Sequence, residues 1–511
     1  MIKIVRLKKA WIFGCLTFIC LLALYFWQGQ HDIIFLRPQS VHQWAQCDRA
    51  SVALNYFQED MNFFKPRVHN LDNGSGITGL EFPIVNYSVA VLYSLFGFYE
   101  WIYRVFMLIL FSIGMMVFSK IAKYYLKDSM LATGVTLLYA ATPLLMFYAA
   151  SFLPDVAALS FFLVSWWILL KEKIQSKARL IYWTLFFALA ALIKISILIY
   201  LPPIMFLVFQ NEETKKQIKH YLLASAAVML IVFAWYFYAA ALSKSTNSEV
   251  FLLRMIWVKS FSEFISVFKE IRVSWINRLY PTTISLVLFF LPLIFLMLSF
   301  FKSKLKYFAA IAWLTLSVFL LLMWPQLRHH DYYMISLSVI FPVVMILICQ
   351  LLIQFKIPLR MLSLLVFALA LNQGIRSKEN LEIVYNKSNW QYGYTHFDLY
   401  FNLDSSLANL GVKPEDQIVS VYDHTPDISL YLINHKGVGV TFHDPKNTIN
   451  AYLKSGQFKY LLYNVHSEYG DSPFQSDDFP LKFIGKADGL DIYSVNSYRQ
   501  GSPNKAFNLY P

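Results

Sequence analysis

Long apolar runs alternate with short, lysine-rich connectors until about residue 373, and the pattern after that point is mixed. A helix needs about 20 mainly apolar residues to cross a bilayer. The pattern therefore predicts a polytopic α-helical membrane protein. The apolar runs lie near residues 10–28, 84–98, 102–122, 129–148, 154–171, 180–194, 196–209, 220–242, 283–301, 307–324, 335–354 and 359–373.

One apolar run, at 84–98, is not expected to cross the membrane. Lysines and arginines gather in cytoplasmic connectors, so the basic connector at 120–127 should face the cytoplasm. If every apolar run crossed the membrane, this connector would instead lie on the outer side. The run at 84–98 is short, opens with Phe-Pro and contains Asn86 and Ser88. We predict a re-entrant or interfacial helix on the outer face, which leaves about 11 spans.

The region 1–373 forms the predicted membrane domain. Its basic start and first apolar run are followed by no small-residue cleavage site, so we expect an uncleaved first helix. The topology then gives a first outer loop at 29–101. Loops of this length are usually functional.

The region 374–511 has the pattern of a small α/β domain, which the topology places outside the cytoplasm. Turn signals at Asp488-Gly489 suggest that its last two strands form a hairpin. The helical segments are expected in PDISLYLINHKG and near 446–455, and the strands in QIVSVYD, GVGVTF, KYLLYN, LKFIGKA and LDIYSV.

Composition agrees with a membrane protein and argues against a nucleic-acid-binding one. Of the residues, 57% are hydrophobic and 15% are charged, and the net charge is +13. The basic residues lie at the ends of apolar runs and form no basic module, so the positive-inside rule explains them. The four cysteines form no disulfide framework.

Three acidic residues recur at the predicted outer ends of helices: Asp48, Glu81 and Asp155. Ionisable groups at membrane depth are costly, and they mark functional sites by default. Transfer of a sugar to a hydroxyl needs a carboxylate that accepts the hydroxyl proton. The structural alternatives are a solvated loop acid for Asp48, a helix-dipole partner for Glu81 and a helix cap for Asp155.

Four cationic or ionisable side chains fall at the same predicted level: Arg104, Lys194, Arg328 and His329. Arginine and lysine there can stabilise the phosphate of a lipid leaving group. The alternative is that they extend toward lipid headgroups. Lys194 fits that alternative least well, because it interrupts a short apolar hairpin.

The motifs HQWAQCDRA, GLEFPIVNY, GFYEWIYR, SFLPDVAAL, ALIKIS and RHHDYY occur in this order within residues 1–360. Together they resemble the GT-C superfamily of membrane glycosyltransferases, and in particular the protein O-mannosyltransferases and the lipid A aminoarabinose transferase.

The resemblance implies that the first outer loop carries the catalytic acid, Asp48. It implies that Arg104 contacts the donor phosphate and that Asp155 is a second essential acid. Relatives have an acid followed by Lys-Pro-Pro where this chain has Glu81-Phe-Pro, so the lysine is missing here. The loop 243–282 lacks the histidine that holds a metal in some relatives. No metal is therefore assigned, although a divalent cation stays an alternative.

The sequence thus predicts a multi-pass glycosyltransferase of the plasma (inner) membrane. The donor would be a polyprenyl-phosphate-linked sugar, and the acceptor hydroxyl would belong to a glycan, lipid or protein on the outer face. Transfer would invert the anomeric centre. The partners are membrane lipids and no nucleic acid. A transporter or flippase of a lipid-linked sugar, a non-catalytic scaffold, and an oligosaccharide ligase or polymerase remain the alternatives.

Overall fold

The computed structural model describes residues 2–171, 175–251, 257–389, 396–423, 425–440, 445–466 and 476–495. The chain divides into two compact units, each made of three segments. Unit 1 contains Met1–Phe35, Tyr103–Tyr236 and Leu253–Ile383, and unit 2 contains Leu36–Ile102, Phe237–Leu252 and Val384–Pro511. The predicted division into 1–373 and 374–511 stays a prediction, and residues 496–511 of the second part lie outside the described residues.

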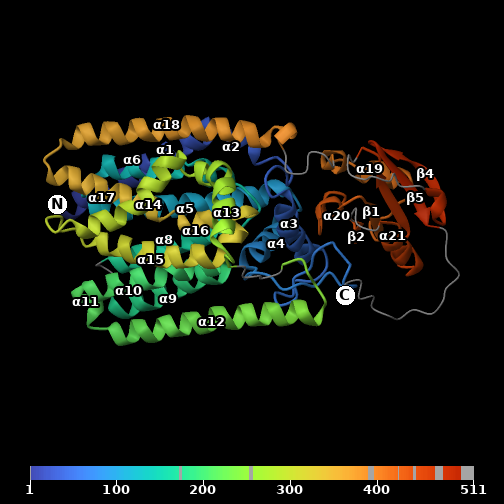
Figure 1. Cartoon of the computed structure of the whole chain (residues 1–511), viewed down its shortest axis with the longest axis horizontal. Coiled ribbons are helices and arrows are strands. Elements are labelled where there is room, and N and C mark those ends of the chain that lie inside the picture. The colour runs from blue at the N-terminus through green and yellow to red at the C-terminus, as the bar shows by residue number, and fades with distance from the viewer. Residues whose placement is uncertain are drawn as a thin grey trace. The chain divides into compact units, whose positions relative to one another are not determined.

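Unit 1 is helical (Figure 1). Three of its long helices, α5, α12 and α18, continue into residues of unit 2. Its α-helices are α1 (Ile2–Trp27), α2 (Gln30–Ile33), α5 (Glu100–Leu126), α6 (Ser129–Ala140), α7 (Pro143–Ala149), α8 (Asp155–Leu170), α9 (Ser176–Ile193), α10 (Leu201–Gln210), α11 (Glu212–Lys215), α12 (Ile218–Ser245), α13 (Phe261–Ser274), α14 (Thr282–Met297), α15 (Leu305–Met323), α16 (Tyr333–Leu337), α17 (Ile340–Gln354) and α18 (Leu359–Tyr385). The 3-10 helices are η1 (Ile195–Tyr200), η2 (Ile276–Arg278) and η3 (Trp324–Arg328).

The described part of the chain has 6 helices that are long and apolar enough to span a membrane, or up to 8 if each bent pair counts as one span. Four of the six are α5, α9, α12 and α18, and the other two are the continuous stretches Leu305–Arg328 and Tyr333–Gln354. The bent pairs are α6 with α7, at 77°, and α13–η2 with α14, at 89°. The prediction of a mostly helical membrane protein is therefore confirmed.

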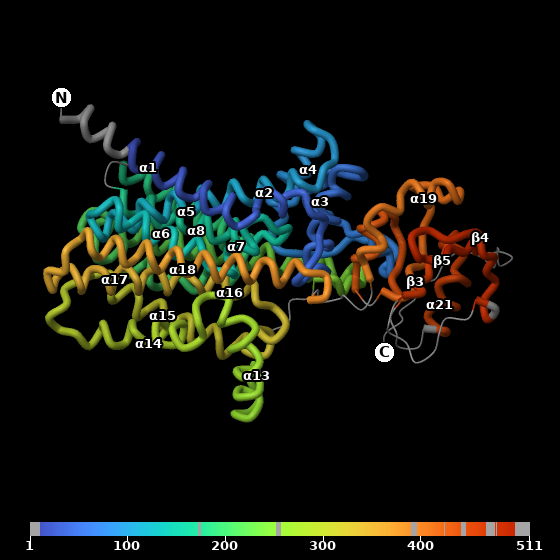
Figure 2. Tube along the Cα trace, turned by 90° about the horizontal axis from the view of Figure 1, so that it is seen from above, coloured from blue at the N-terminus to red at the C-terminus, as the bar shows by residue number. Residues whose placement is uncertain are grey.

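Capping residues fix the helix ends of unit 1. The Asp128 side chain accepts a hydrogen bond from the Leu131 N–H at 2.8 Å and begins α6. Pro143 takes the first position of α7, where no N–H partner is needed. Ser260 caps α13 by accepting from the Glu263 N–H at 3.1 Å. Figure 2 shows that α13 projects from the other helices of the unit.

The core of unit 1 packs through small residues and stacked aromatic rings. A side chain in place of Gly114 on α5 would meet the Ser160 side chain of α8 at 2.3 Å, so these helices need the glycine to approach this closely. The Trp166 and Phe308 rings stack with centroids 4.6 Å apart, which joins α8 to α15. These contacts hold α8, whose first residue is Asp155, in a fully packed interior.

Unit 2 combines two helices of the predicted first outer loop, α3 (Gln43–Gln58) and α4 (Ile84–Phe96), with a sheet from the C-terminal part. The five-stranded sheet has the order β2-β1-β3-β5-β4. Strand β1 is parallel to β2 and β3, and β5 is antiparallel to β3 and β4. The remaining elements are η4 (Lys387–Asn389), η6 (Phe397–Tyr400), α19 (Asp404–Asn409), β1 (Ile418–Val421), α20 (Ile428–Leu432), β2 (Gly437–Val440), α21 (Pro445–Lys454), β3 (Tyr460–Asn464), η7 (Ser476–Asp478), β4 (Leu481–Ala487) and β5 (Leu490–Val495).

All five predicted strands and both predicted helices of the C-terminal part are present. The predicted hairpin joins β4 to β5 through Asp488 and Gly489, whose φ angles are +45° and +91°. Such a two-residue turn needs positive φ at both positions, which suits an Asp-Gly pair.

Candidate functional site

Asp48 lies inside helix α3 of unit 2. Its side chain has 0% exposure, and neither carboxylate oxygen has a hydrogen-bond partner among the described residues. Burial raises the pKa of Asp48 well above its usual range, and the negative charge of Asp427 raises it further. Arg49 opposes this shift. A raised pKa favours a carboxyl group that can take up a proton near neutral pH.

Glu81 is bound to the residue that follows Asp48. The Arg49 Nε donates to the Glu81 Oε1 at 2.9 Å, and both side chains are largely buried. Arg49 also donates to the Ala45 carbonyl at 3.2 Å and lies 5.1 Å from the Phe251 ring centroid. Glu81 is thus a charge partner that holds Arg49 beside α3.

Asp155 and Lys194 form an ion pair within unit 1. Asp155 is the first residue of α8 after Pro154, and its Oδ1 lies 2.6 Å from the Lys194 Nζ. The Asp155 side chain is 1% exposed and that of Lys194 is 12% exposed. The Lys194 ammonium lies 4.6 Å and 4.5 Å from the ring centroids of Tyr332 and Tyr333. The predicted site residues Asp155 and Lys194 are therefore in direct contact, and two tyrosine rings pack beside the lysine.

Arg104 is a fully buried side chain of α5. Its Nη1 donates to the carbonyl of Ala150 at 2.7 Å, and its guanidinium lies 4.6 Å from the Phe152 ring centroid. Both partners belong to the segment that leads into α8. Burial with backbone and aromatic partners argues against the headgroup-seeking alternative, because that alternative needs an exposed guanidinium.

Arg328 and His329 lie at the end of η3. Arg328 forms an ion pair of 2.8 Å with Glu270 of α13 and donates to the Ser266 hydroxyl at 3.3 Å. The His329 side chain is exposed. None of the contacts given for these two residues joins them to Asp155 or Lys194, and their role in phosphate binding stays a prediction.

A buried network in unit 1 was missed by the sequence analysis. The Asp331 carboxylate, which is 0% exposed, accepts from Arg278 Nη1 at 2.8 Å and from the Tyr148 hydroxyl at 2.5 Å. Asp331 directly precedes Tyr332 and Tyr333, so it belongs to the same segment as the two rings that pack beside Lys194. The motif RHHDYY could have revealed Asp331, because the acid follows closely on Arg328 and His329, which the sequence analysis singled out.

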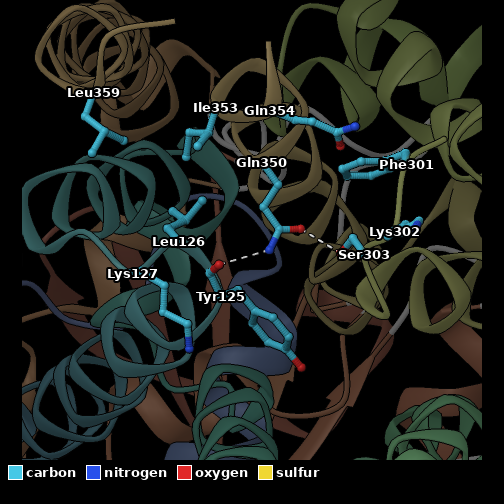
Figure 3. A pocket seen from close by; sticks show the side chains of 10 residues that line it. All are labelled: Tyr125, Leu126, Lys127, Phe301, Lys302, Ser303, Gln350, Ile353, Gln354 and Leu359. Carbon is cyan, nitrogen blue, oxygen red and sulfur yellow. Dashed lines mark hydrogen bonds between the residues drawn. The ribbon is translucent and has the colours of Figure 1, made fainter. Parts of the chain in front are cut away.

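The structure contains a surface pocket that uses none of the predicted site residues. It has a volume of about 500 Å³ and lies in unit 1 (Figure 3). Gln350 bridges its walls, because its Nε2 donates to the Tyr125 carbonyl at 2.9 Å and its Oε1 accepts from the Ser303 hydroxyl at 2.7 Å. The lining residues are Tyr125, Leu126, Lys127, Phe301, Lys302, Ser303, Gln350, Ile353, Gln354 and Leu359.

Within the described residues, no three histidine, cysteine, aspartate or glutamate side chains are grouped as ligands of a metal ion. The predicted acids Glu81 and Asp155 are instead each bound to a cation.

Two solved structures share the fold of this chain over almost its whole length. The crystal structure of ArnT from Cupriavidus metallidurans in the apo state superposes with a TM-score of 0.53 at 14% sequence identity, covering 96% of this chain and 98% of ArnT. The structure of the same protein bound to undecaprenyl phosphate gives 0.52 at 14% identity and covers 97% and 99%. At this identity the likeness shows the fold. No curated protein matches in sequence.

A family model adds sequence evidence. Residues 81–238 match the family of dolichyl-phosphate-mannose-protein mannosyltransferases. This partial match and the fold shared with ArnT both agree with the predicted resemblance to GT-C glycosyltransferases. The matched segment contains Glu81, Arg104, Asp155 and Lys194, whereas Asp48 precedes it. The predicted resemblance is thereby confirmed, and the roles of the individual residues remain to be proposed.

Proposed function

We propose that this protein is a GT-C glycosyltransferase that transfers a sugar from a polyprenyl-phosphate donor to an acceptor hydroxyl on the outer face of the plasma membrane, with inversion at the anomeric carbon. The match of residues 81–238 to a mannosyltransferase family supports a glycosyltransferase. The ArnT structure with bound undecaprenyl phosphate supports the lipid class of the donor. The acceptor would be a glycan, lipid or protein.

The observation that carries the proposal is the difference between Asp48 and the other candidate acids. Glu81 is bound to Arg49, and Asp155 is bound to Lys194. The oxygens of Asp48 have neither a cation nor a hydrogen-bond donor among the described residues. A carboxylate with no fixed partner can accept the acceptor proton without first breaking an ion pair.

The transfer step follows from this assignment. The acceptor oxygen forms a bond to the anomeric carbon while the bond from that carbon to the phosphate oxygen breaks. The hydroxyl proton passes to Asp48, and polyprenyl phosphate leaves with the electron pair of the broken bond. Attack opposite the leaving phosphate inverts the anomeric configuration, as in inverting glycosidases whose carboxylate base activates the nucleophile.

The cations of unit 1 would serve the leaving phosphate. Lys194 and Arg104 are assigned this role, because charge on the phosphate grows as the bond breaks and fixed cations stabilise it. Asp155 holds Lys194 in place through their 2.6 Å contact. Arg328 and His329 are assigned to the outer edge of the phosphate site, and Glu81 keeps Arg49 beside α3. No step requires a metal ion.

The proposed topology has about 11 spans. Beside the 6 to 8 candidate spans, the described chain has four shorter apolar helices. Counting Trp11–Trp27, Asp155–Leu170 and Ile195–Gln210 as spans, together with the 6 long helices and the 2 bent pairs, gives this number. The fourth short helix, α4, has 13 residues and would be the re-entrant or interfacial helix on the outer face. The domain 374–511 would then lie outside the cytoplasm.

The test is a transfer assay on full-length protein in proteoliposomes, with undecaprenyl phosphate carrying one monosaccharide at a time as the donor. We expect release of undecaprenyl phosphate with at least one donor, and a loss of about 10²–10⁴-fold in Asp48→Asn. Asp60→Asn is the matched control, because Asp60 is an exposed acid of the same unit. Wild-type rates in folded Asp48→Asn would refute the base assignment. Movement of the donor across the bilayer without its cleavage would favour a flippase.

A further inference from the structure

His69, a residue of the predicted first outer loop, lies between α3 and the C-terminal part of unit 2. It is buried, with 2% exposure. On one side, the Ser51 hydroxyl of α3 lies 2.6 Å from Nδ1 of the His69 ring and also accepts the His69 N–H at 2.9 Å. On the other side, Nε2 of the ring lies 3.3 Å from the Oδ1 of Asn434, which follows α20. His69 thus contacts both the helix that carries Asp48 and the C-terminal part.

Two further contacts hold His69 against the C-terminal part. Its carbonyl accepts the N–H of Gly437, the first residue of β2, at 3.1 Å. The ring meets that of Tyr431, a residue of α20, at 88° with the centroids 5.9 Å apart. Helix α20 also packs against α3. Backbone and ring are both held, so the imidazole cannot turn without breaking contacts with the C-terminal part.

The hydrogen bonds around the ring define which of its nitrogens carries the proton. Nδ2 of Asn55 donates to the Arg67 carbonyl at 3.1 Å, which orients the amide, and the same Nδ2 lies 3.3 Å from Nδ1 of His69. Because Nδ1 faces an amide donor, it is the acceptor, and it accepts the Ser51 proton as well. The proton of the ring is then on Nε2, which donates it to Asn434. Burial lowers the pKa of His69 to about 3, which agrees with a neutral ring.

Helix α3 is buried on almost every side, so no exposed face distinguishes one rotation of the helix from another. All of its residues from Gln43 to Tyr56 except Trp44 are buried. Hydrophobic contact has no preferred direction, whereas a hydrogen bond depends on distance and angle. Ser51 follows Asp48 by three residues, so the two side chains are neighbours on one helix face. The bond that fixes Ser51 therefore also fixes the direction of the Asp48 side chain.

We propose that His69 is a positioning residue of the transfer reaction, because it fixes the orientation of α3, and with it Asp48, against the C-terminal part. The inference rests on the proposed function of Asp48 as the base. It gives the C-terminal part a role in catalysis, since Tyr431 and Asn434 hold the imidazole that holds Ser51. His69 acts through Ser51 and exchanges no proton with the acceptor.

The test compares two variants of Ser51 in the proteoliposome transfer assay, with rates given per folded protein. Ser51→Ala removes the hydroxyl that bonds His69, and Ser51→Thr keeps a hydroxyl. A displacement of about 1 Å can slow an enzyme about 10²-fold, so we expect a loss of up to about 10²-fold in kcat for Ser51→Ala and recovery in Ser51→Thr. The KM for the donor should not change, because the cations assigned to the donor phosphate lie in unit 1. The acidic limb of kcat/KM should also stay in place, since Asp48 is intact.

The control for a purely structural effect is Ser248→Ala. Ser248 is another buried serine of unit 2, and its hydroxyl donates to the Thr78 Oγ1 at 2.7 Å, which lies in the loop and not on α3. Its loss should reduce the amount of folded protein, as Ser51→Ala does, but leave kcat per folded protein at the wild-type value. Equal losses of kcat in Ser51→Ala and Ser248→Ala would overturn the positioning role.

Asn434→Gly tests the contact from the side of the C-terminal part. Asn434 has a φ of +50°, which glycine adopts freely, so this change removes the amide without straining the backbone. We expect a smaller loss of kcat than in Ser51→Ala, because the bond to Asn434 is 3.3 Å long and the bond to Ser51 is 2.6 Å long. In Ser51→Ala protein, where His69 no longer bonds the hydroxyl of α3, adding Asn434→Gly should slow transfer no further.

The outcomes separate the two proposals. If Asp48→Asn loses transfer while Ser51→Ala and Asn434→Gly keep the wild-type kcat, the positioning role is refuted and the base assignment stands. If Asp48→Asn transfers at wild-type rates, the proposed function fails, whatever the Ser51 variants show. If Ser51→Ala does not fold, Asn434→Gly decides alone, and an unchanged kcat refutes the positioning role.

Discussion

Asp155 of unit 1 and Asp48 of unit 2 are both buried acids, but their carboxylates differ in the partners that they have. Asp155 lies 2.6 Å from Lys194, whose ammonium lies against two tyrosine rings. Asp48 has no cation or donor at its oxygens among the described residues. The first acid is held in an ion pair. The second can exchange a proton, and this is the property that a base requires.

The difference follows from the cost of burying charge. Unit 1 contains most of the candidate spans, and its buried acids Asp155 and Asp331 are each bound to a cation. An uncompensated charge there would be costly, so pairing stabilises both partners. At Asp48 the cost is instead met by raising the pKa, so that the acid holds its proton more tightly. This difference is the reason for proposing Asp48, and neither of the paired acids, as the base.

The largest effect on stability should come from breaking the Asp331 network. Asp331→Ala leaves Arg278 buried and unpaired, so we expect a loss of about 3–5 kcal/mol in the free energy of unfolding. Denaturation of the purified protein in mixed micelles measures it. Asp128→Ala, which removes only a helix cap, should cost about 1 kcal/mol. Equal losses in the two variants would contradict the role given to the network.

The Asp155–Lys194 pair should show strong coupling in a double-mutant cycle. Asp155→Asn and Lys194→Met should each slow transfer, and the double variant should lose less than the sum, with a coupling of about 0.5–3 kcal/mol. The reason is that each single variant leaves an uncompensated charge behind. Lys177→Met is the control, because Lys177 is an exposed lysine in the first turn of α9, the helix that Lys194 directly follows. Additive losses would mean that the two residues act independently.

The half-exposed pair of Arg328 with Glu270 should matter least. Exposed ion pairs contribute about 0–1 kcal/mol, so Glu270→Gln should barely change stability or transfer. Arg328→Gln separates the two roles considered for Arg328. If it weakens binding of undecaprenyl phosphate while Glu270→Gln does not, Arg328 contacts the phosphate. If both variants bind equally well, its predicted role in phosphate binding is refuted.

Much of the fold could be predicted from the sequence, because apolar runs and strand periodicity are local signals. The pattern in QIVSVYD and KYLLYN gave β1 and β3, and Asp488-Gly489 gave the hairpin turn. Most candidate acids and cations were also found from their placement at the ends of apolar runs.

The partners of those residues could not be predicted. Asp155 looks in the sequence like an ordinary acid at a helix start, and only the folded chain brings it within 2.6 Å of the Lys194 ammonium. The pairing of Arg278 with Asp331 is likewise a contact between distant segments. Local patterns carry no information about which distant segments meet, so the ion pairs had to come from the structure.

The central claim is that Asp48 is the base, and the pH dependence of kcat/KM in wild type and Asp48→Asn tests it most directly. A base must be deprotonated, so wild-type activity should fall as the pH drops through the raised pKa of Asp48. Asp48→Asn should retain only a residual rate, about 10²–10⁴-fold lower, without that acidic limb. A folded Asp48→Asn protein with the wild-type rate and the same acidic limb would contradict the account.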